Sequence, residues 1–170
     1  MKVFGIAGYK NAGKTTLAVD VIRELTRRGF SVATVKHAHH EFDIDHPGKD
    51  SHLHRQAGAR EVIVASSARW AHIVELDNRP EPSLRDLLKQ VGEADLVIVE
   101  GFKHGDHPKL ETRRHGSDAP LIAAEHDSVR AVVSDGDVPD APVPVLARAD
   151  VSAIVDFILA QVGLEKLGSE

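Results

Sequence analysis

The chain has 170 residues, of which 42% are apolar and 28% are charged, a balance that suits one globular domain with a sizeable core. Its formal net charge of -5 argues against a general nucleic-acid-binding protein, which usually presents a basic face. Cysteine is absent from the sequence, which excludes disulfides and thiolate metal sites.

The first predicted element is an apolar strand over residues 3–7. It begins without a charged leader and a small-residue cleavage site. No apolar run in the sequence approaches the roughly 18 residues that a membrane-spanning helix needs. We therefore expect a cytoplasmic protein with no membrane partner.

This strand leads into the segment Gly8-Tyr9-Lys10-Asn11-Ala12-Gly13-Lys14-Thr15-Thr16, which fits the phosphate-binding pattern G-x-x-x-x-G-K-[ST]. The two framing glycines let the backbone turn so that successive N–H groups face one concavity. Lys14 adds a mobile cation for the outer phosphates, and the Thr15 hydroxyl is suited to bind Mg²⁺. We predict a nucleoside triphosphate site formed by Gly8, Asn11, Ala12, Gly13, Lys14, Thr15 and Thr16, with Thr15 also a metal ligand.

A helix is predicted next, over residues 15–28, because its apolar side chains recur at helical spacing. Gly29 supplies the stop at its C-terminal end. The segment 31–35 then has the pattern of a buried strand. Together these elements predict a strand-loop-helix-strand unit with parallel pairing and a right-handed crossover.

The polar loop 36–51 follows, and it would lie on the same edge of the sheet as the phosphate loop. Its aspartates Asp43, Asp45 and Asp50 could reach Mg²⁺ or a water beside a bound triphosphate. Asp50 is the catalytic candidate among them. Four histidines in this loop leave a transition-metal site as an alternative, although His37, His39 and His40 show no recognised ligand spacing.

Further elements follow in quick succession. A short helix is predicted from residue 50 or 51 to 57, followed by strands over 61–65 and 70–76. A helix over 83–91 precedes an almost wholly apolar strand over 95–100.

Glu100 ends that apolar strand, where phosphate-loop proteins place a second acidic group close to the metal held by the loop threonine. A carboxylate there can hold a metal-bound water or position the attacking one. Glu100 is therefore predicted as both a catalytic residue and a metal ligand. The alternative is an acid that merely ends a strand at the surface.

The segment 102–115 is polar and basic, and residues 109–113 alternate as either a strand or a β-arm would. Its positive charge could take an anionic second ligand, or it could be a solvated basic arm. The anion could also be the phosphates of a nucleotide bound by a facing subunit. The residues concerned are Lys103, Lys109, Arg113 and Arg114, with His104, His107 and His115.

Three short strands are predicted over 121–124, 129–134 and 143–146, with Pro144 restricting the last to an edge or a strand start. An amphipathic helix then runs to Gly163. Asp135 follows the second of these strands and could accept the two donors of a guanine base, or simply form an Asp-Gly turn.

These elements predict an α/β fold of the phosphate-loop NTPase type, with three layers, a mostly parallel central sheet flanked by helices, and a β-arm as an additional element. We expect one nucleotide-binding domain over residues 1–164 and a disordered tail over 165–170.

Several segments together resemble the MobB family, the molybdopterin-guanine dinucleotide biosynthesis protein B. The match covers most of the chain in the right order. Besides the phosphate loop, the segments are Lys36-His37-Ala38-His39-His40, Asp43-Ile44-Asp45-His46-Pro47-Gly48-Lys49-Asp50-Ser51, His54-Arg55-Gln56-Ala57-Gly58-Ala59 and Val99-Glu100-Gly101-Phe102-Lys103.

The resemblance implies a homodimer that binds GTP and Mg²⁺, hydrolyses GTP weakly, and acts as an accessory to the MobA guanylyltransferase that attaches GMP to molybdopterin. It implies that Gly13, Lys14 and Thr15 bind phosphates and Mg²⁺, that Glu100 is the second acidic group and that Asp135 reads the base. The 43–51 loop would border the γ-phosphate or a pterin partner.

Other functions remain open on the sequence. A small-molecule kinase is compatible with the size and the phosphate loop, although no arginine-studded helical lid is evident. The 11 histidines suggest a GTP-dependent metal-insertion chaperone, which the lack of cysteine disfavours. A nucleotide-sensing interaction module without turnover is the remaining alternative.

Overall fold

The computed structural model describes residues 1–38 and 42–165, and the chain forms two compact units. The first unit comprises Met1–His37 together with the chain from Leu84 onward, and the second comprises Ala38–Ser83. The expectation of one domain over residues 1–164 stays a prediction. The expected disordered tail lies, from residue 166 on, outside the described residues.

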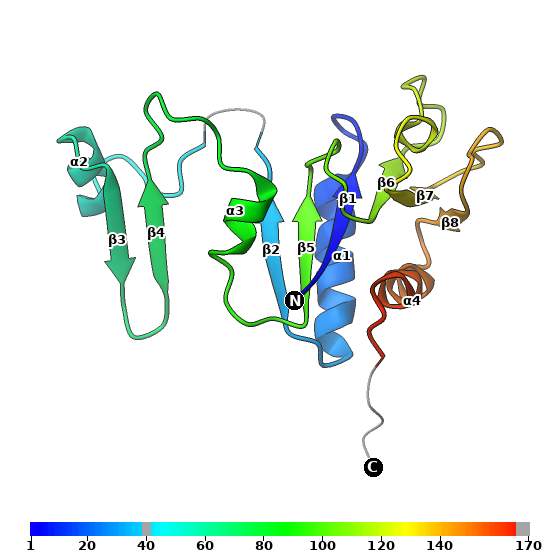
Figure 1. The fold of residues 1–170 in the computed structure, drawn as a ribbon, viewed down its shortest axis with the longest axis horizontal. Coiled ribbons are helices and arrows are strands. Elements are labelled where there is room, and N and C mark those ends of the chain that lie inside the picture. Colours follow the sequence, from blue (N-terminus) through cyan, green and yellow to red (C-terminus); the bar gives the residue numbers. More distant parts are fainter. Residues whose placement is uncertain (39–41, 166–170) are drawn as a thin grey trace, which may run out of the picture. The chain divides into compact units, whose positions relative to one another are not determined.

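A six-stranded sheet forms the centre of the first unit, in the order β2-β5-β1-β6-β7-β8 (Figure 1). All of its neighbouring strands pair in parallel, as expected of a chain that alternates strands with helical crossovers. The strands are β1 Lys2–Ala7, β2 Val32–Lys36, β5 Leu96–Glu100, β6 Lys109–Arg113, β7 Val129–Ser134 and β8 Val145–Ala147.

Strand β1 lies between β5 and β6, and the register brings their carboxyl ends to one edge of the sheet. Ile6 lies opposite Glu100 of β5, and Ala7 lies opposite Glu111 of β6. The phosphate loop therefore begins beside the end of β5 and the middle of β6, whose acidic residues are level with the last residues of β1.

Helices cover both faces of this sheet, which gives the predicted three layers. Helices α1 (Lys14–Arg27) and α4 (Val151–Val162) pack on one face over a core that includes Phe4 and Ile6. Helix α3 (Leu84–Leu88) packs on the other face. Among the described residues, no helix has the length and apolar character needed to cross a membrane.

The segment 121–124 is not a strand, so that prediction is wrong. Residues Ile122–Ala124 form a 3₁₀ helix, η1. The backbone N–H of Ala123 donates to the Glu111 carboxylate at 2.9 Å, so a side chain from β6 replaces a ladder partner. Predicted edge strand β8 is confirmed, with Pro144 just before it.

The sequence predicts either a strand or a β-arm over residues 109–113; the strand is confirmed and the β-arm is wrong, because β6 is an interior strand of the central sheet. Its residues Lys109, Glu111 and Thr112 are buried and make internal hydrogen bonds. Lys109 is fully buried, and its ammonium donates to the Gly105 carbonyl and, at 2.7 Å, to the Ser128 hydroxyl. Burial lowers the pKa of Lys109 to about 8. Lys109 therefore belongs to no solvated basic surface.

The second unit contains helix α2 (Asp50–Gln56) and an antiparallel ribbon of β3 (Glu61–Ala65) and β4 (Trp70–Val74). This ribbon is a separate two-stranded sheet. Arg55 of α2 binds three carboxylates in this unit, which fixes the loop before the helix against the end of the ribbon. The bonds join it to Asp43 at 2.7 Å, Asp45 at 2.6 Å and Glu75 at 2.5 Å.

Candidate functional site

The phosphate loop has a backbone that requires its glycines. Gly8 has φ +153° and Gly13 has φ +87°, and Asn11 between them has φ +65°. A Cβ on Gly8 would lie 2.6 Å from the backbone oxygen of Thr112 in β6. The loop therefore leaves β1 so close to β6 that no other residue fits at position 8.

Lys14 is folded into this loop. Its ammonium donates to the carbonyl oxygens of Gly8 at 2.9 Å and Tyr9 at 2.8 Å. Burial lowers the pKa of Lys14, Glu100 raises it, and Lys36 lowers it further. The lysine thus closes the loop upon itself, at the point where the sequence pattern places it to meet phosphates.

Thr15 and Glu100 meet, as the sequence predicts for a metal site. The Thr15 hydroxyl donates to Glu100 Oε1 at 2.8 Å. The ammonium of Lys36, at the end of β2, lies 3.1 Å from the same carboxylate oxygen and 3.3 Å from Thr15 Oγ1. Two hard oxygens at this separation suit Mg²⁺, because adjacent ligands of an octahedron with bonds of about 2.1 Å lie roughly 3 Å apart. Thr15 and Glu100 would hold the ion, which neutralises charge on a bound triphosphate.

Arg148 and Thr112 support the loop from behind, and sequence reasoning missed both. Arg148 donates to the Gly13 carbonyl at 3.3 Å and to Thr112 Oγ1 at 3.1 Å, while Thr112 Oγ1 donates to the Ala12 carbonyl at 3.2 Å. Burial lowers the pKa of Arg148, with Arg114 adding to the effect. The available signal was positional, since Arg148 directly follows a strand and so belongs to the carboxyl edge of the sheet.

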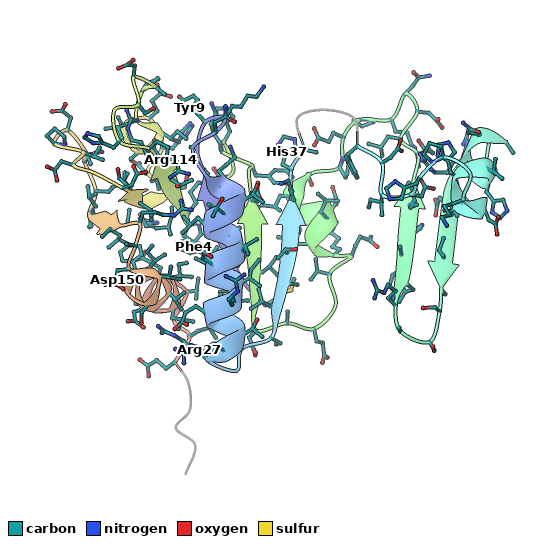
Figure 2. The ribbon with its side chains drawn as sticks, turned by 180° about the vertical axis from the view of Figure 1, so that it is seen from behind. Phe4, Tyr9, Arg27, His37, Arg114 and Asp150 are labelled. Atoms are coloured by element: carbon teal, nitrogen blue, oxygen red, sulfur yellow. The ribbon has the colours of Figure 1, made fainter. Side chains whose placement is uncertain are left out.

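The side chain of Arg114 lies between Asp135 and the phosphate loop. The Asp135 carboxylate accepts the backbone N–H of His115 at 2.5 Å and a guanidinium N–H of Arg114 at 3.1 Å, and these two bonds, in that order, lower the pKa of Asp135. The other terminal nitrogen of the same guanidinium, Arg114 Nη2, lies 3.4 Å from where a Cβ on Gly13 would stand. Figure 2 shows Arg114 beside the start of α1 and Tyr9 in the loop above it.

Asp50 lies in the second unit, where it opens helix α2, and its catalytic role stays a prediction. Asp43 and Asp45 of the same loop are engaged with Arg55. Of the histidines considered for a metal site, His39 and His40 lie outside the described residues. Within the described ranges, no group of three or more histidine, aspartate or glutamate side chains is arranged to hold a metal ion.

Comparison with known proteins decides which phosphate-loop family this geometry belongs to. The model of the family described as "Molybdopterin guanine dinucleotide synthesis protein B", MobB, matches residues 3–135. The chain belongs to the MobB family. The molybdopterin-guanine dinucleotide biosynthesis adapter protein of Escherichia coli K12 is 38% identical over 163 residues, covering 92% of this chain and 91% of that protein. Its Haemophilus influenzae namesake is 41% identical over 122 residues, or 70% of this chain and 67% of that protein.

Solved MobB structures have the same fold. The MobB homologue from Bacillus stearothermophilus superposes with a TM-score of 0.71 at 27% identity, covering 96% of this chain and 99% of that one. Bacillus subtilis MobB gives a TM-score of 0.73 at 20% identity, covering 95% and 98%. The α/β phosphate-loop fold predicted from the sequence is confirmed as the fold of this family.

Proposed function

We propose that this MobB-family protein binds GTP with Mg²⁺ and serves as an accessory protein in molybdopterin-guanine dinucleotide synthesis, in the cytoplasm, beside a MobA-type guanylyltransferase. The observation that best supports nucleotide binding is the meeting of Lys14, Thr15 and Glu100 at one edge of the sheet. The family and its curated adapter proteins support the pathway.

In this proposal the loop amides from Asn11 to Thr16 receive the phosphates at the N-terminal end of α1, where the helix dipole favours negative charge. Lys14 leaves the carbonyls of Gly8 and Tyr9 to meet the outer phosphates. Thr15 and Glu100 hold Mg²⁺, and Lys36 withdraws from them.

Hydrolysis would be slow and secondary to binding. Glu100 is the residue that can orient a water beside the metal, and Asp50 is the second catalytic candidate. An accessory protein needs the nucleotide chiefly as a bound ligand, so weak turnover agrees with an adapter role.

Guanine selection is assigned to Asp135. A carboxylate accepts both the N1–H and the N2–H₂ of guanine, a pair of donors that adenine does not offer. The Arg114 bond to Asp135 would have to open for the base to enter. Asp135 also lies at the carboxyl end of β7, two strands from β1 on the side of β6, within reach of a nucleotide extending from the loop.

A homodimer is proposed through the ribbon of the second unit. On one face of the ribbon two large apolar side chains are exposed to an unusual extent, Ile63, which is paired with His72, at 66% and Trp70, which is paired with Ala65, at 68%. Val74, 40% exposed, continues the same face. Large apolar side chains that line one face of a short ribbon favour burial against another copy.

Competition titrations of GTP against ATP with Mg²⁺ test the nucleotide assignment. GTP should bind more tightly, and Asp135→Asn should shift preference toward xanthosine triphosphate, because the new amide donates where guanine donated. Asp137→Asn is the matched control, since it makes the same change two residues along the same loop. Equal affinity for GTP and ATP would reject guanine selection. A preference for xanthosine triphosphate in Asp137→Asn alone would show that Asp137, and not Asp135, recognises the base.

A further inference from the structure

A small cavity lies on the other side of the phosphate loop from the metal site. Its volume is about 260 Å³. The loop lines it from Tyr9 to Ala12, and the end of β6 with the next residue lines it from Glu111 to Arg114, together with Ser117. Lys14, Thr15 and Glu100 are not among its lining residues. Asn11 and Ala12 belong both to this cavity and to the predicted triphosphate site, whereas Lys14 and the two proposed metal ligands of that site lie outside the cavity.

The cavity lies at a topological switch point of the sheet. After β1 the chain turns to α1 on one face, whereas after β6 it turns to η1 on the other. The two loops therefore diverge between neighbouring parallel strands, and open α/β sheets bind ligands in the crevice that forms there.

Arg113 supplies a buried donor beside this cavity. Its Nη2 donates to the carbonyls of Ser117 at 2.5 Å and Ala119 at 2.7 Å, which fixes the guanidinium. Its Nη1 is buried and finds no hydrogen-bond partner among the described residues. The nearest carboxylate oxygen, Glu111 Oε1, is 3.8 Å away, and the other oxygen of Glu111 accepts the Ala123 N–H. A buried guanidinium N–H without an acceptor is costly and calls for one from a ligand.

The charge and the size of the cavity limit the class of ligand that it can bind. Lys10, Arg113 and Arg114 line the cavity against the single carboxylate of Glu111, so cations predominate in a protein whose net charge is -5. A volume of about 260 Å³ exceeds the roughly 30 Å³ of one water, yet lies below the range of about 300–1,000 Å³ typical of whole small-molecule sites. This suits a compact anionic group at the end of a longer molecule.

We propose that this cavity binds the terminal phosphate monoester of the acceptor that is joined to the guanine nucleotide, an inference that rests on the proposed function. A dinucleotide of this kind links its halves through a pyrophosphate, so the acceptor half brings a phosphate monoester. A small shift of the guanidinium would bring the buried Arg113 Nη1 to that phosphate, and Lys10 would cover it from the exposed side. The protein would then bind the guanine nucleotide and the acceptor on either side of one loop, which suits an adapter.

Amide NMR titrations of the whole protein with phenyl phosphate test the site. The protein is first saturated with Mg²⁺ and a non-hydrolysable GTP analogue, so that the front of the loop is filled. Saturable shifts are expected at residues 9–12 and 111–117. Arg113→Gln should weaken this binding about tenfold or more, since it removes a charge-assisted bond. Arg23→Gln, an exposed change on α1, is the matched control and should leave it unchanged.

Lys10→Gln provides a second variant, because Arg113 also holds the 117–119 turn and its replacement can disturb the fold. It should weaken phenyl phosphate binding about threefold while GTP affinity stays the same. Absence of saturable shifts in the nucleotide-loaded protein, or equal affinity in both variants and the wild type, would overturn the site. Inorganic phosphate binding as tightly as phenyl phosphate would instead overturn the monoester assignment. Failure of the GTP analogue to bind would reject the proposed nucleotide function, and the phenyl phosphate comparison then still tests the cavity in the unloaded protein.

Discussion

Replacing Lys14 with alanine distinguishes the contribution of the outer phosphates to nucleotide binding from the contribution of the rest of the nucleotide. In the structure the Lys14 ammonium is bonded to the carbonyls of Gly8 and Tyr9, so it must leave both before it can reach a phosphate. Lys14→Ala should therefore weaken GTP binding by the energy of the lysine–phosphate interaction minus the energy of the two carbonyl bonds that the lysine gives up. GMP, which lacks the outer phosphates, should be affected little.

The size of this difference follows from the contacts. An ammonium about 4 Å from a unit negative charge in a half-buried site gains about 4 kcal/mol. The two bonds to backbone carbonyls are worth about 1 kcal/mol each, so about 2 kcal/mol remains. This predicts a loss of about thirtyfold in GTP affinity and less than about threefold in GMP affinity.

Isothermal titration calorimetry with GTP and GMP in the presence of Mg²⁺ measures both values. Lys10→Gln is the control, because Lys10 is an exposed lysine of the same loop outside the Lys14 contacts. An unchanged GTP affinity in Lys14→Ala would remove the phosphate-loop assignment. Equal losses for GTP and GMP would show that the lysine supports the loop rather than the outer phosphates.

Three further predictions concern other parts of the chain. Glu100→Gln should keep GTP affinity within about threefold and slow phosphate release at least about tenfold, and wild-type turnover in this variant would make the acid structural. Lys109→Met tests the buried ammonium, whose pKa is about 8 in the folded protein against the usual 10.5. Between these two pH values the folded protein binds fewer protons than the unfolded chain. The free energy of unfolding should therefore rise with pH across that window, by up to about 1.4 kcal/mol per pH unit. Urea unfolding at pH 8 and 10 should show this extra slope in the wild type only; parallel slopes contradict it. Trp70→Ser should convert the proposed dimer to a monomer in light scattering, and a dimer of unchanged dissociation constant would place the interface elsewhere.

The phosphate loop was predictable because its function and its backbone depend on the same few residues. Gly8 and Gly13 are required by positive φ, and Lys14 and Thr15 by their chemistry, so a local pattern is enough. The contact between Glu100 and Thr15 was predictable for a related reason, because Glu100 ends a buried strand that pairs with β1 and so lies next to the loop.

Strand β6 shows where local patterns fail. The polar residues among 109–113 suggested a solvent-exposed segment, because a prediction from alternation assumes that polar side chains face water. Here Lys109 and Glu111 instead bond to Ser128 and Ala123, residues distant in sequence that only the folded sheet brings near. The same applies to Arg148, whose partners at the loop belong to two other segments. Tertiary partners of this kind leave no periodic signal.

The position of Lys36 bears on how nucleotides exchange. The Lys36 amine contacts Thr15 and Glu100, the two residues proposed to bind Mg²⁺, so the protein carries a counterion for them at the end of β2. The Glu100 carboxylate is thus balanced by Lys36, and under the proposed function the fold would not depend on bound Mg²⁺ or nucleotide. Under the proposed function, release of Mg²⁺ would need only its replacement by the Lys36 ammonium, which favours nucleotide exchange without a dedicated exchange partner.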